Sequence, residues 1–562
     1  MKRAHDLPTQ GNNSLANCIE CLNDKKNNEM KKILIMVLLF PLFYGCSDFL
    51  DPKQVDLVYN EVFWTNQNDA ENGLVGVYSL YRALKVNSKN WYQRGDVTTG
   101  FINRGWNGGS PDDLYLPGNF NASSDSKSWG SVEDYADWSN FYKVVAQANL
   151  VIKKIEEIPN DKFSTGTKNQ FLGEAYFLRA LVYFDILRTW GNAPYIAESI
   201  ESSTQVINDD LTPILIGRTD DTEIGKNILA DISIAKSKLK YSVPGATGWG
   251  IRANLGSAQA LAGHVNMWMY FLANRENMAN PKQYLTNAIA SLDSLRTYGG
   301  YSLADYSATD ALTLLYKGGS TEAVFELNIS SDQNESYRVD YGGVENYTCK
   351  ILPLDGDLTK DRASYINYIP KSQKDLIYPE YTNGDIRPNL FFKAWDSPYN
   401  EPFSNVSTVA IDRELVTWMC KYAMMTVDPS RTWNEYIAYF AEANIPIFRY
   451  TDLYLLLAEA YCKNNQPDKA LPIIHDIRSR AGLAEYSGSD LLKEVLQERI
   501  SELIGEGQIY YDMVRNNNFP NAQVMGNARY QQEGYYWPVS SKILSTNKLV
   551  SQTPYWNGKT VW

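Results

Sequence analysis

The stretch Lys168–Trp190 reads KNQFLGEAYFLRALVYFDILRTW and carries the clearest structural signal in the chain. Its apolar side chains recur at helical spacing on two faces, which are Phe171, Ala175, Leu178 and Val182 on the first and Phe177, Leu181, Phe184 and Leu187 or Arg188 on the second. A helix that is apolar on two sides is expected to lie between neighbouring helices. Gly191 follows directly and Pro194 comes soon after, so the helix is expected to end at Trp190.

Helical periodicity continues on both sides of this stretch. It predicts further helices at Asn68–Leu84, Trp138–Ile158, Asp221–Leu239, Ala253–Asn274, Pro281–Tyr298, Tyr450–Asn465, Asp468–Ala481 and Asp490–Asn516. Several come in pairs of roughly 34 residues, the length typical of tetratricopeptide units. Small residues suit the contacts between such helices, and candidates are Ala175, Ala180, Ala260, Ala458 and Ala460. The predicted fold class is mostly α: tetratricopeptide-like helix pairs form a scaffold with long irregular loops and a few short β-strands.

Two regions lack this periodicity. Residues 87–137 are rich in Gly, Asn, Ser and Trp, and residues 320–444 mix loops with short β-like runs such as EAVFELNIS. Both contain aromatic residues, which are Trp91, Trp106, Tyr115, Phe120 and Trp129 in the first and Tyr337, Tyr341, Tyr347, Tyr365, Tyr368, Trp395 and Tyr399 in the second. Long irregular insertions on a rigid scaffold usually carry binding function.

Residues 30–45 have the pattern of a targeting signal. Lys31 and Lys32 precede the apolar run Ile33–Phe43, which is too short to span a bilayer, and Gly45 then precedes Cys46. We interpret residues 1–29 as a non-structural extension before Met30, and residues 30–45 as a lipoprotein signal peptide that leaves Cys46 for acylation. The match to a bacterial lipobox is imperfect, and the alternative is a plain signal peptide with Cys46 retained by chance.

Composition excludes several classes of function. The chain has 562 residues and a net charge of -12, so nucleic acid is a poor partner. Its six cysteines form no disulfide framework and no paired zinc motif, and its three histidines are widely separated. The acidic run DGDLTKD at residues 355–361 lacks the full ligand pattern of a calcium loop. We therefore expect no metal and no cofactor.

Several ordered motifs resemble those of one family. FLGEAYFLRALVYFDILRTWGNAPY (Phe171–Tyr195) looks like the EA.FLRA..YF.L...WG..P signature of SusD/RagB-type outer-membrane nutrient-binding lipoproteins. IPIFRYTDLYLLLAEAY, IRSRAGL, ERISELIGEGQIYYDMVR and PVSSKILSTNKLVSQTPYW, all within residues 445–556, resemble its later blocks in order. Ile509 departs from the usual Arg. The resemblance implies one large SusD-like domain, with an N-terminal helical region at 46–300 that contains the ligand-facing insertion 87–137, and a C-terminal region at 301–562 that contains the insertion 320–444.

The resemblance also implies a function. The protein would be a cell-surface lipoprotein on the outer membrane that binds an oligosaccharide or polysaccharide and delivers it to a SusC-like TonB-dependent transporter. Such proteins are not enzymes. The sequence leaves open whether the nutrient is a glycan, a peptide or something else. Two other readings stay open: a surface endo-acting glycoside hydrolase, and a helical-repeat scaffold that binds only proteins.

Sugar recognition needs aromatic faces for the C–H surface of the ring and polar groups for its hydroxyls. The segment FINRGWNGGSPDDLYLPGNF (Phe101–Phe120) supplies both. The candidate ligand-binding residues are Trp106, Tyr115, Asn107, Asp112 and Arg104 in this segment, and Tyr341, Tyr365 and Trp395 in the later insertion. Each aromatic taken alone is also explained by core packing or by plugging a loop. The adjacent Asp112 and Asp113 could suggest a hydrolase pair, but such neighbours are more often solvated loop residues.

One carboxylate is expected to be structural. Glu459 lies on an apolar predicted helix, with Arg449, Arg478 and Arg480 near in sequence. A buried charge must be paired, so we expect an arginine or backbone donors to hold Glu459.

Overall fold

The computed structural model describes residues 63–86, 94–99, 103–104, 136–208, 212–329, 367–370, 381–393, 416–419, 421–422, 425–433, 436–441, 443–520, 522 and 524–559. The chain divides into two compact units, Met1–Trp64 and Thr65–Trp562. Of the first unit the structure describes only Phe63 and Trp64, so the predicted extension, signal peptide and Cys46 lie outside the described residues. The elements below all belong to the second unit, which is the single large domain that the resemblance implies.

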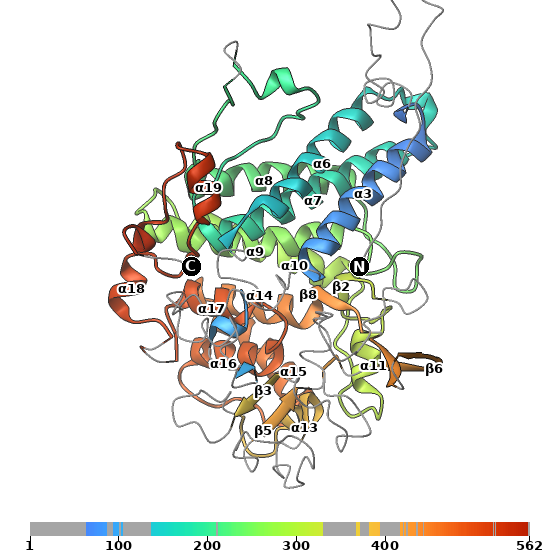
Figure 1. Cartoon of the computed structure of the whole chain (residues 1–562). Helices are drawn as coiled ribbons and strands as arrows, with labels where there is room; N and C mark the ends of the chain where they lie inside the picture. The colour runs from blue at the N-terminus through green and yellow to red at the C-terminus, as the bar shows by residue number, and fades with distance from the viewer. Residues whose placement is uncertain are drawn as a thin grey trace, which may run out of the picture. The chain divides into compact units, whose positions relative to one another are not determined.

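Helices dominate this unit (Figure 1). The α-helices are α3 (Gln67–Val86), α6 (Ser139–Glu157), α7 (Thr167–Trp190), α8 (Asp221–Lys238), α9 (Leu255–Arg275), α10 (Lys282–Tyr298), α11 (Ala311–Tyr316), α13 (Arg387–Phe391), α14 (Tyr450–Lys463), α15 (Pro467–Arg480), α16 (Leu491–Leu503), α17 (Ile509–Asn516), α18 (Asn527–Gln531) and α19 (Ser541–Thr546). Short 3-10 helices are η4 (Val97–Thr99), η6 (Asn160–Lys162), η7 (Ser203–Gln205) and η11 (Pro554–Trp556). The mostly α prediction is confirmed. No described helix is long and apolar enough to cross a bilayer.

Helix α7 is the centre of the N-terminal helices. It packs against α3, α6 and α8, and every residue from Phe171 to Trp190 except Tyr176 is buried. This confirms the prediction that a helix with two apolar faces lies between neighbours. The helix ends at Gly191, whose φ of +66° favours glycine, and a Cβ there would lie 2.6 Å from the Tyr536 ring. The N-terminal helices are thereby joined to the C-terminal end of the chain.

The helices of the C-terminal part pack on this frame, with α14 against α10, α15 and α16. Every predicted helix but one is confirmed, with ends within two residues. The single helix predicted at Asp490–Asn516 is wrong, because the chain leaves helical geometry after Leu503 and resumes it at Ile509. Gly505 and Gly507 lie between the two, with φ of +83° and +80°. Left-handed backbone of this kind ends a right-handed helix.

The described strands form three small antiparallel sheets. They are β2 (Ala323–Leu327) with β8 (Ile445–Arg449), β6 (Met425–Trp433) with β7 (Tyr436–Ala441), and a four-stranded sheet in the order β1 (Asn103–Arg104), β3 (Asn367–Pro370), β5 (Val416–Met419) and β4 (Phe392–Lys393). The β-like run EAVFELNIS contains β2, as predicted. Every residue of β2 is buried. Its sequence is therefore a continuous apolar run, interrupted only by Glu326.

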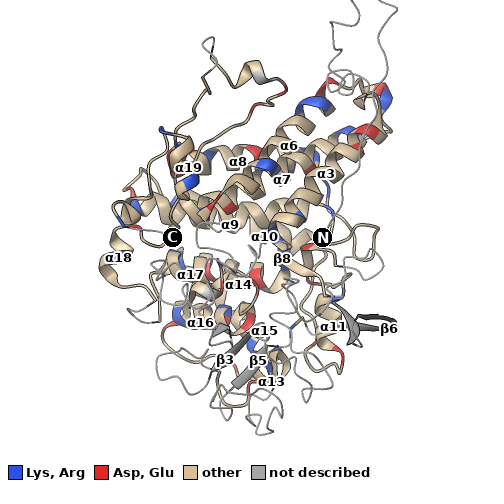
Figure 2. Cartoon of the chain, in the orientation of Figure 1, with Lys and Arg blue, Asp and Glu red and all other residues tan. Residues whose placement is uncertain are grey.

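Basic and acidic positions both occur on the C-terminal helices (Figure 2). Many of these charged side chains are buried. Glu459 is paired as predicted, but its partner is Arg515, whose guanidinium donates to it at 2.8 Å. The three arginines nearest to Glu459 in sequence serve other carboxylates, which are Glu322 and Glu506 for Arg449, Glu494 and Glu498 for Arg478, and Glu322 and Glu502 for Arg480. The position of Glu459 on an apolar helix therefore predicted that it needs a partner. Nearness in sequence did not identify Arg515 as that partner.

Candidate ligand-binding site

The turn between α16 and α17 organises the region around both insertions. We call Gly505, Glu506 and Gly507 the GEG turn. Its two glycines have positive φ, so its backbone N–H and C=O groups point away from any helical ladder and need other partners. Segments of both insertions supply those partners.

The first insertion is fixed to the GEG turn by Asp96. Its carboxylate accepts hydrogen bonds from the backbone N–H of Gly505, at 3.1 Å, and of Gly507. Next to it, the Tyr510 N–H donates to the Gly95 carbonyl at 2.9 Å. The two backbones are so close that a Cβ on Gly95 would lie 2.0 Å from the Gly507 oxygen. Burial raises the pKa of Asp96 to about 7, although the two backbone donors favour the charged form.

The neighbouring Arg94 has a different environment. Its guanidinium lies over the rings of Phe141, Trp190 and Trp537, at 5.1 to 5.3 Å from their centres. Stacking of this kind holds a cation against aromatic faces. The segment that leads into the predicted ligand loop is therefore anchored twice, at Arg94 and at Asp96.

The second insertion reaches the same turn through Lys421 and Tyr422. The Tyr422 hydroxyl donates to the Gly505 carbonyl at 3.1 Å. The Glu506 carboxylate accepts from three donors, which are Lys421 Nζ at 2.7 Å, Arg449 Nε at 2.6 Å and the Tyr316 hydroxyl at 3.0 Å. Burial lowers the pKa of Lys421, and the Glu506 charge opposes that effect. One turn of three residues thus holds both insertions.

The two ends of the second insertion are also held together. Leu327 of β2 lies opposite Ile445 of β8, and Asn444 completes the junction. Its side-chain oxygen accepts from the Ile329 N–H at 2.9 Å, and its Nδ2 donates to Glu326 at 2.8 Å. Further along, Arg387 ties α13 to α16 through Glu498 and Glu502, at 2.6 and 3.1 Å. The two ends of the second insertion are therefore held in fixed positions.

The four-stranded sheet joins the two insertions directly. Arg104 of β1 lies opposite Asn367 of β3. Because these strands are antiparallel, β1 ends at the same end of the sheet at which β3 begins. Strands β3 and β4 are both antiparallel to β5, so β4 runs in the same direction as β3.

The structure places one of the predicted ligand-binding residues, and only by its backbone: Arg104 is in β1. The others lie outside the described residues, and they are Trp106, Asn107, Asp112, Tyr115, Tyr341, Tyr365 and Trp395. The acidic run at residues 355–361 also lies outside them. The grouping of these side chains stays a prediction. Within the described ranges, no cluster of His, Cys, Asp or Glu could hold a metal ion.

Sequence reasoning missed the residues that position the insertions, above all Asp96, Lys421 and Asn444. One signal was available: the G-E-G triplet inside a predicted helix puts two glycines where each would cost about 1 kcal/mol relative to alanine. That cost marks a break in the helix. It does not reveal which distant residues meet there.

Comparisons with known proteins agree with this architecture. The SusD family model matches residues 321–556, and a second model, described as starch-binding associating with outer membrane, matches residues 110–243. Together they cover well over half of the chain. The chain belongs to the SusD/RagB family, a class of carbohydrate-binding proteins associated with the outer membrane.

Individual relatives extend this similarity over nearly the whole chain. SusD-like protein P38 of Formosa agariphila is 26% identical over 94% of this chain and 100% of its own length. A SusD-like protein of Bacteroides ovatus is 24% identical over 90% of this chain and 86% of its own. A solved SusD homolog from Bacteroides thetaiotaomicron has a TM-score of 0.67 at 23% identity, covering 88% of this chain and 99% of that one. At this level of identity, the similarity to the solved structure shows a shared fold.

Proposed function

We propose that this protein captures an oligosaccharide at the cell surface and delivers it to a SusC-like TonB-dependent transporter in the outer membrane. The ligand lies against aromatic and polar residues of the two insertions, with Trp106, Tyr115 and Arg104 from the first and Tyr341, Tyr365 and Trp395 from the second. Asn107 and Asp112 read hydroxyl groups. The protein binds its ligand without cleaving it, and it uses no cofactor and no metal.

The observation that carries this proposal is the common anchorage of both insertions. Asp96 of the first and Tyr422 of the second bond the same GEG turn, and Arg104 pairs with Asn367 across one sheet. Two loops that each contribute one side of a binding face must be held in register with each other, because an ordered site loses less entropy on binding. Family membership supplies the class of ligand.

The leader sequence and the family support this location and this role in transport. Acylation of Cys46 would supply several acyl chains, and each buried CH₂ contributes about 0.8 kcal/mol to membrane attachment. A protein held there by its N-terminus is placed to pass its ligand to a transporter in the same membrane. Co-purification of a TonB-dependent transporter with the tagged protein, from detergent-solubilised outer membranes, checks this part.

The binding experiment is affinity electrophoresis through gels that contain starch, laminarin, xylan, pectin or alginate. We expect one of these polysaccharides to retard the wild-type protein, and the double variant Trp106→Ala/Tyr341→Ala to lose most of that retardation. Tyr298→Ala is the matched control, because Tyr298 is 69% exposed on α10 and lies in neither insertion. Circular dichroism confirms that each variant is folded.

The outcomes separate the remaining alternatives. New reducing ends during incubation with the retarding polysaccharide identify a glycoside hydrolase and overturn the proposal. Co-purification of the transporter without retardation by any polysaccharide identifies a protein-binding scaffold. If the double variant migrates like wild type in a retarding gel, the ligand binds elsewhere on the protein.

A further inference from the structure

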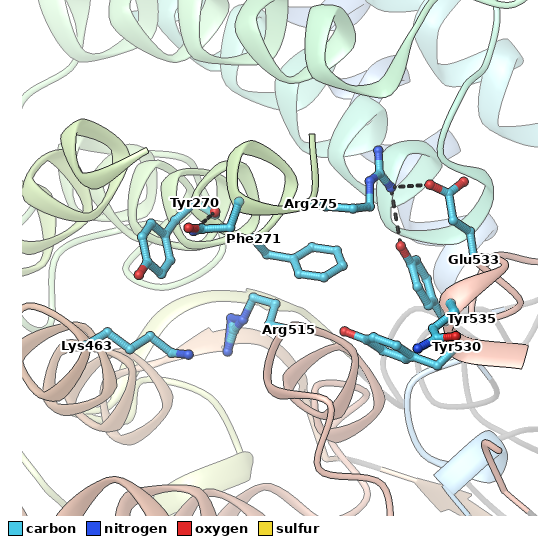
Figure 3. A pocket seen from close by; sticks show the side chains of 10 residues that line it. Tyr270, Phe271, Arg275, Lys463, Arg515, Tyr530, Glu533 and Tyr535 are labelled. Carbon is cyan, nitrogen blue, oxygen red and sulfur yellow. Dashed lines mark hydrogen bonds and ion pairs between the residues drawn. The ribbon is translucent and has the colours of Figure 1, made fainter. Parts of the chain in front are cut away.

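A cavity of about 480 Å³ lies at the C-terminal end of α9, away from both insertions in sequence (Figure 3). Tyr270 and Phe271 of α9 form one side, and Lys463, Arg515 and Tyr530 face them from the other. The volume falls within the ~300–1,000 Å³ of typical small-molecule sites. Neither the proposed function nor the predicted ligand residues use this cavity.

Three of the rings that line the cavity, those of Phe271, Tyr530 and Tyr535, are held in place by contacts with other rings. Phe271 packs at 5.3 Å from the Trp268 ring and at 5.8 Å from the Tyr535 ring. Tyr535 in turn packs on Tyr530 at 5.2 Å, and the Tyr530 hydroxyl donates to the Val514 carbonyl at 2.6 Å. The rings therefore present a fixed apolar surface that a ligand meets without reordering it.

Both arginines that line the cavity already have carboxylate partners. Arg275 pairs with Asp221 at 2.7 Å, Glu276 at 2.8 Å and Glu533 at 3.1 Å. Arg515 pairs with two more, which are Glu459 at 2.8 Å and Asp512 at 2.6 Å. A ligand anion would compete with these carboxylates. The charge balance favours a neutral ligand.

Hydrogen-bonding capacity nevertheless remains at this site. The Nε–H of Arg515 is buried without a partner, and the side chain of Arg515 is only 4% exposed. Lys463 has its nearest carboxylate, Glu459, at 3.9 Å, beyond hydrogen-bonding distance. Among the described residues, the Tyr270 hydroxyl and the Gln531 amide also bond to no side chain or backbone group. The Nε–H of Arg515 is the buried donor here, and such a donor is usually satisfied by something, which here would be a ligand or water. Lys463 and Tyr270 are half-buried and Gln531 is exposed.

We infer that this cavity is a second saccharide site, which takes one neutral sugar residue or a disaccharide. Fixed rings accept the C–H face of a pyranose, and Lys463, Arg515, Tyr270 and Gln531 bond its hydroxyls. The class of ligand rests on the proposed function, whereas the location rests on the cavity alone. The site would hold a chain end or a short product apart from the two insertions.

The experiment is saturation-transfer NMR with the methyl glycosides of glucose, galactose, mannose and xylose. At least one glycoside is expected to bind the wild-type protein and the Trp106→Ala/Tyr341→Ala variant alike. Tyr270→Ala removes a hydroxyl and a ring from the cavity, and it is expected to weaken that binding about fivefold, the order of one lost hydrogen bond or ring contact. Gln531→Ala tests the same cavity from an exposed position, where folding is not at risk, and Tyr298→Ala is the control.

The readouts keep the two sites apart. Binding of glycoside that is lost in the Trp106→Ala/Tyr341→Ala variant, and unaffected by Tyr270→Ala and Gln531→Ala, overturns the second site and leaves the proposed function intact. If Tyr270-dependent glycoside binding persists in the Trp106→Ala/Tyr341→Ala variant, the second site is supported. If that variant also migrates like wild type in polysaccharide gels, the placement of the first site in the insertions is overturned. The tripeptide Gly-Tyr-Gly is included as a probe that is not a sugar. The inference is overturned if no glycoside gives a signal, or if only the tripeptide gives a signal that depends on Tyr270.

Discussion

At the scale of single residues, the buried carboxylates fall into two groups with opposite pKa shifts. Asp96 and Glu326 are held mainly by uncharged donors, and burial raises the pKa of each to about 7. Glu502 and Asp452 are equally buried, but neighbouring cations hold their pKa values well below the usual range. Desolvation prevails where the partner is a neutral N–H, and charge attraction prevails where the partner is a guanidinium or an imidazole.

Glu326 therefore gives a pH-dependent contribution to stability that one substitution removes. Its folded pKa lies above the ordinary value of 4.5, so its contribution to stability is present below that value and is lost as the pH rises through 7. Glu326→Gln keeps an oxygen for Asn444 and does not titrate. We expect the free energy of unfolding to fall more steeply from pH 5 to pH 8 in wild type than in Glu326→Gln, as measured by urea denaturation at each pH.

The control for this measurement is Glu485→Gln, at an exposed side chain. Its pH dependence is expected to follow that of wild type. Parallel slopes for wild type and Glu326→Gln would show that Glu326 is ionised in the folded and unfolded proteins alike, contrary to the shift described here.

At the scale of elements, the long helices were predictable and the connections that orient the insertions were not. The period of Phe171, Ala175 and Leu178 defines α7, because burial on two faces leaves a repeated pattern in the sequence. The contact of Asp96 with Gly505 joins residues 409 positions apart, and it leaves no local pattern. Strands of two to four residues, such as β1 and β3, are also too short to show a period.

The close approach of Gly95 to the GEG turn gives the prediction at this scale. Gly95→Ala puts a methyl group 2.0 Å from the Gly507 oxygen, so the segment 94–99 must move off the turn. We expect a loss of about 1–3 kcal/mol in the free energy of unfolding, as for overpacking elsewhere, and faster proteolysis within residues 87–137. Chemical denaturation and timed digestion with trypsin measure the two effects.

Gly217→Ala is the matched control, because the nearest atom to its added methyl is the Leu549 oxygen at 3.6 Å, an ordinary contact. We expect it to stay within about 0.5 kcal/mol of wild type. If Gly95→Ala and Gly217→Ala cost the same, the tight docking of the first insertion on the GEG turn is not present in solution.

At the scale of the whole molecule, a helical frame with a charged interior carries two insertions whose anchors meet. Arg449 contacts Glu322, Glu502 and Glu506, and so spans β8, the segment before β2 and the GEG turn. Removing one partner of such a network leaves an unpaired buried charge, which is costly. This cost favours the one arrangement of the frame in which every charge keeps its partner. The irregular, aromatic and polar sequence of the insertions predicts that they bind a ligand, and this stays a prediction. That sequence could not indicate that one turn holds them both, because that depends on tertiary contacts.

The attachment of the molecule to its membrane depends on a single sulfur atom, if Cys46 is acylated. One acyl chain gives marginal, reversible attachment, and several give a durable one, since each buried CH₂ adds about 0.8 kcal/mol. Cys46→Ser removes the acceptor, so in a host that processes lipoproteins we expect the variant to leave the membrane fraction and to incorporate no labelled palmitate. Ser47→Ala keeps the thiol and is expected to behave as wild type. Palmitate-free protein in the wild-type membrane fraction, or equal sedimentation of Cys46→Ser with membranes, would contradict the lipid anchor and leave a plain signal peptide as the explanation of the leader.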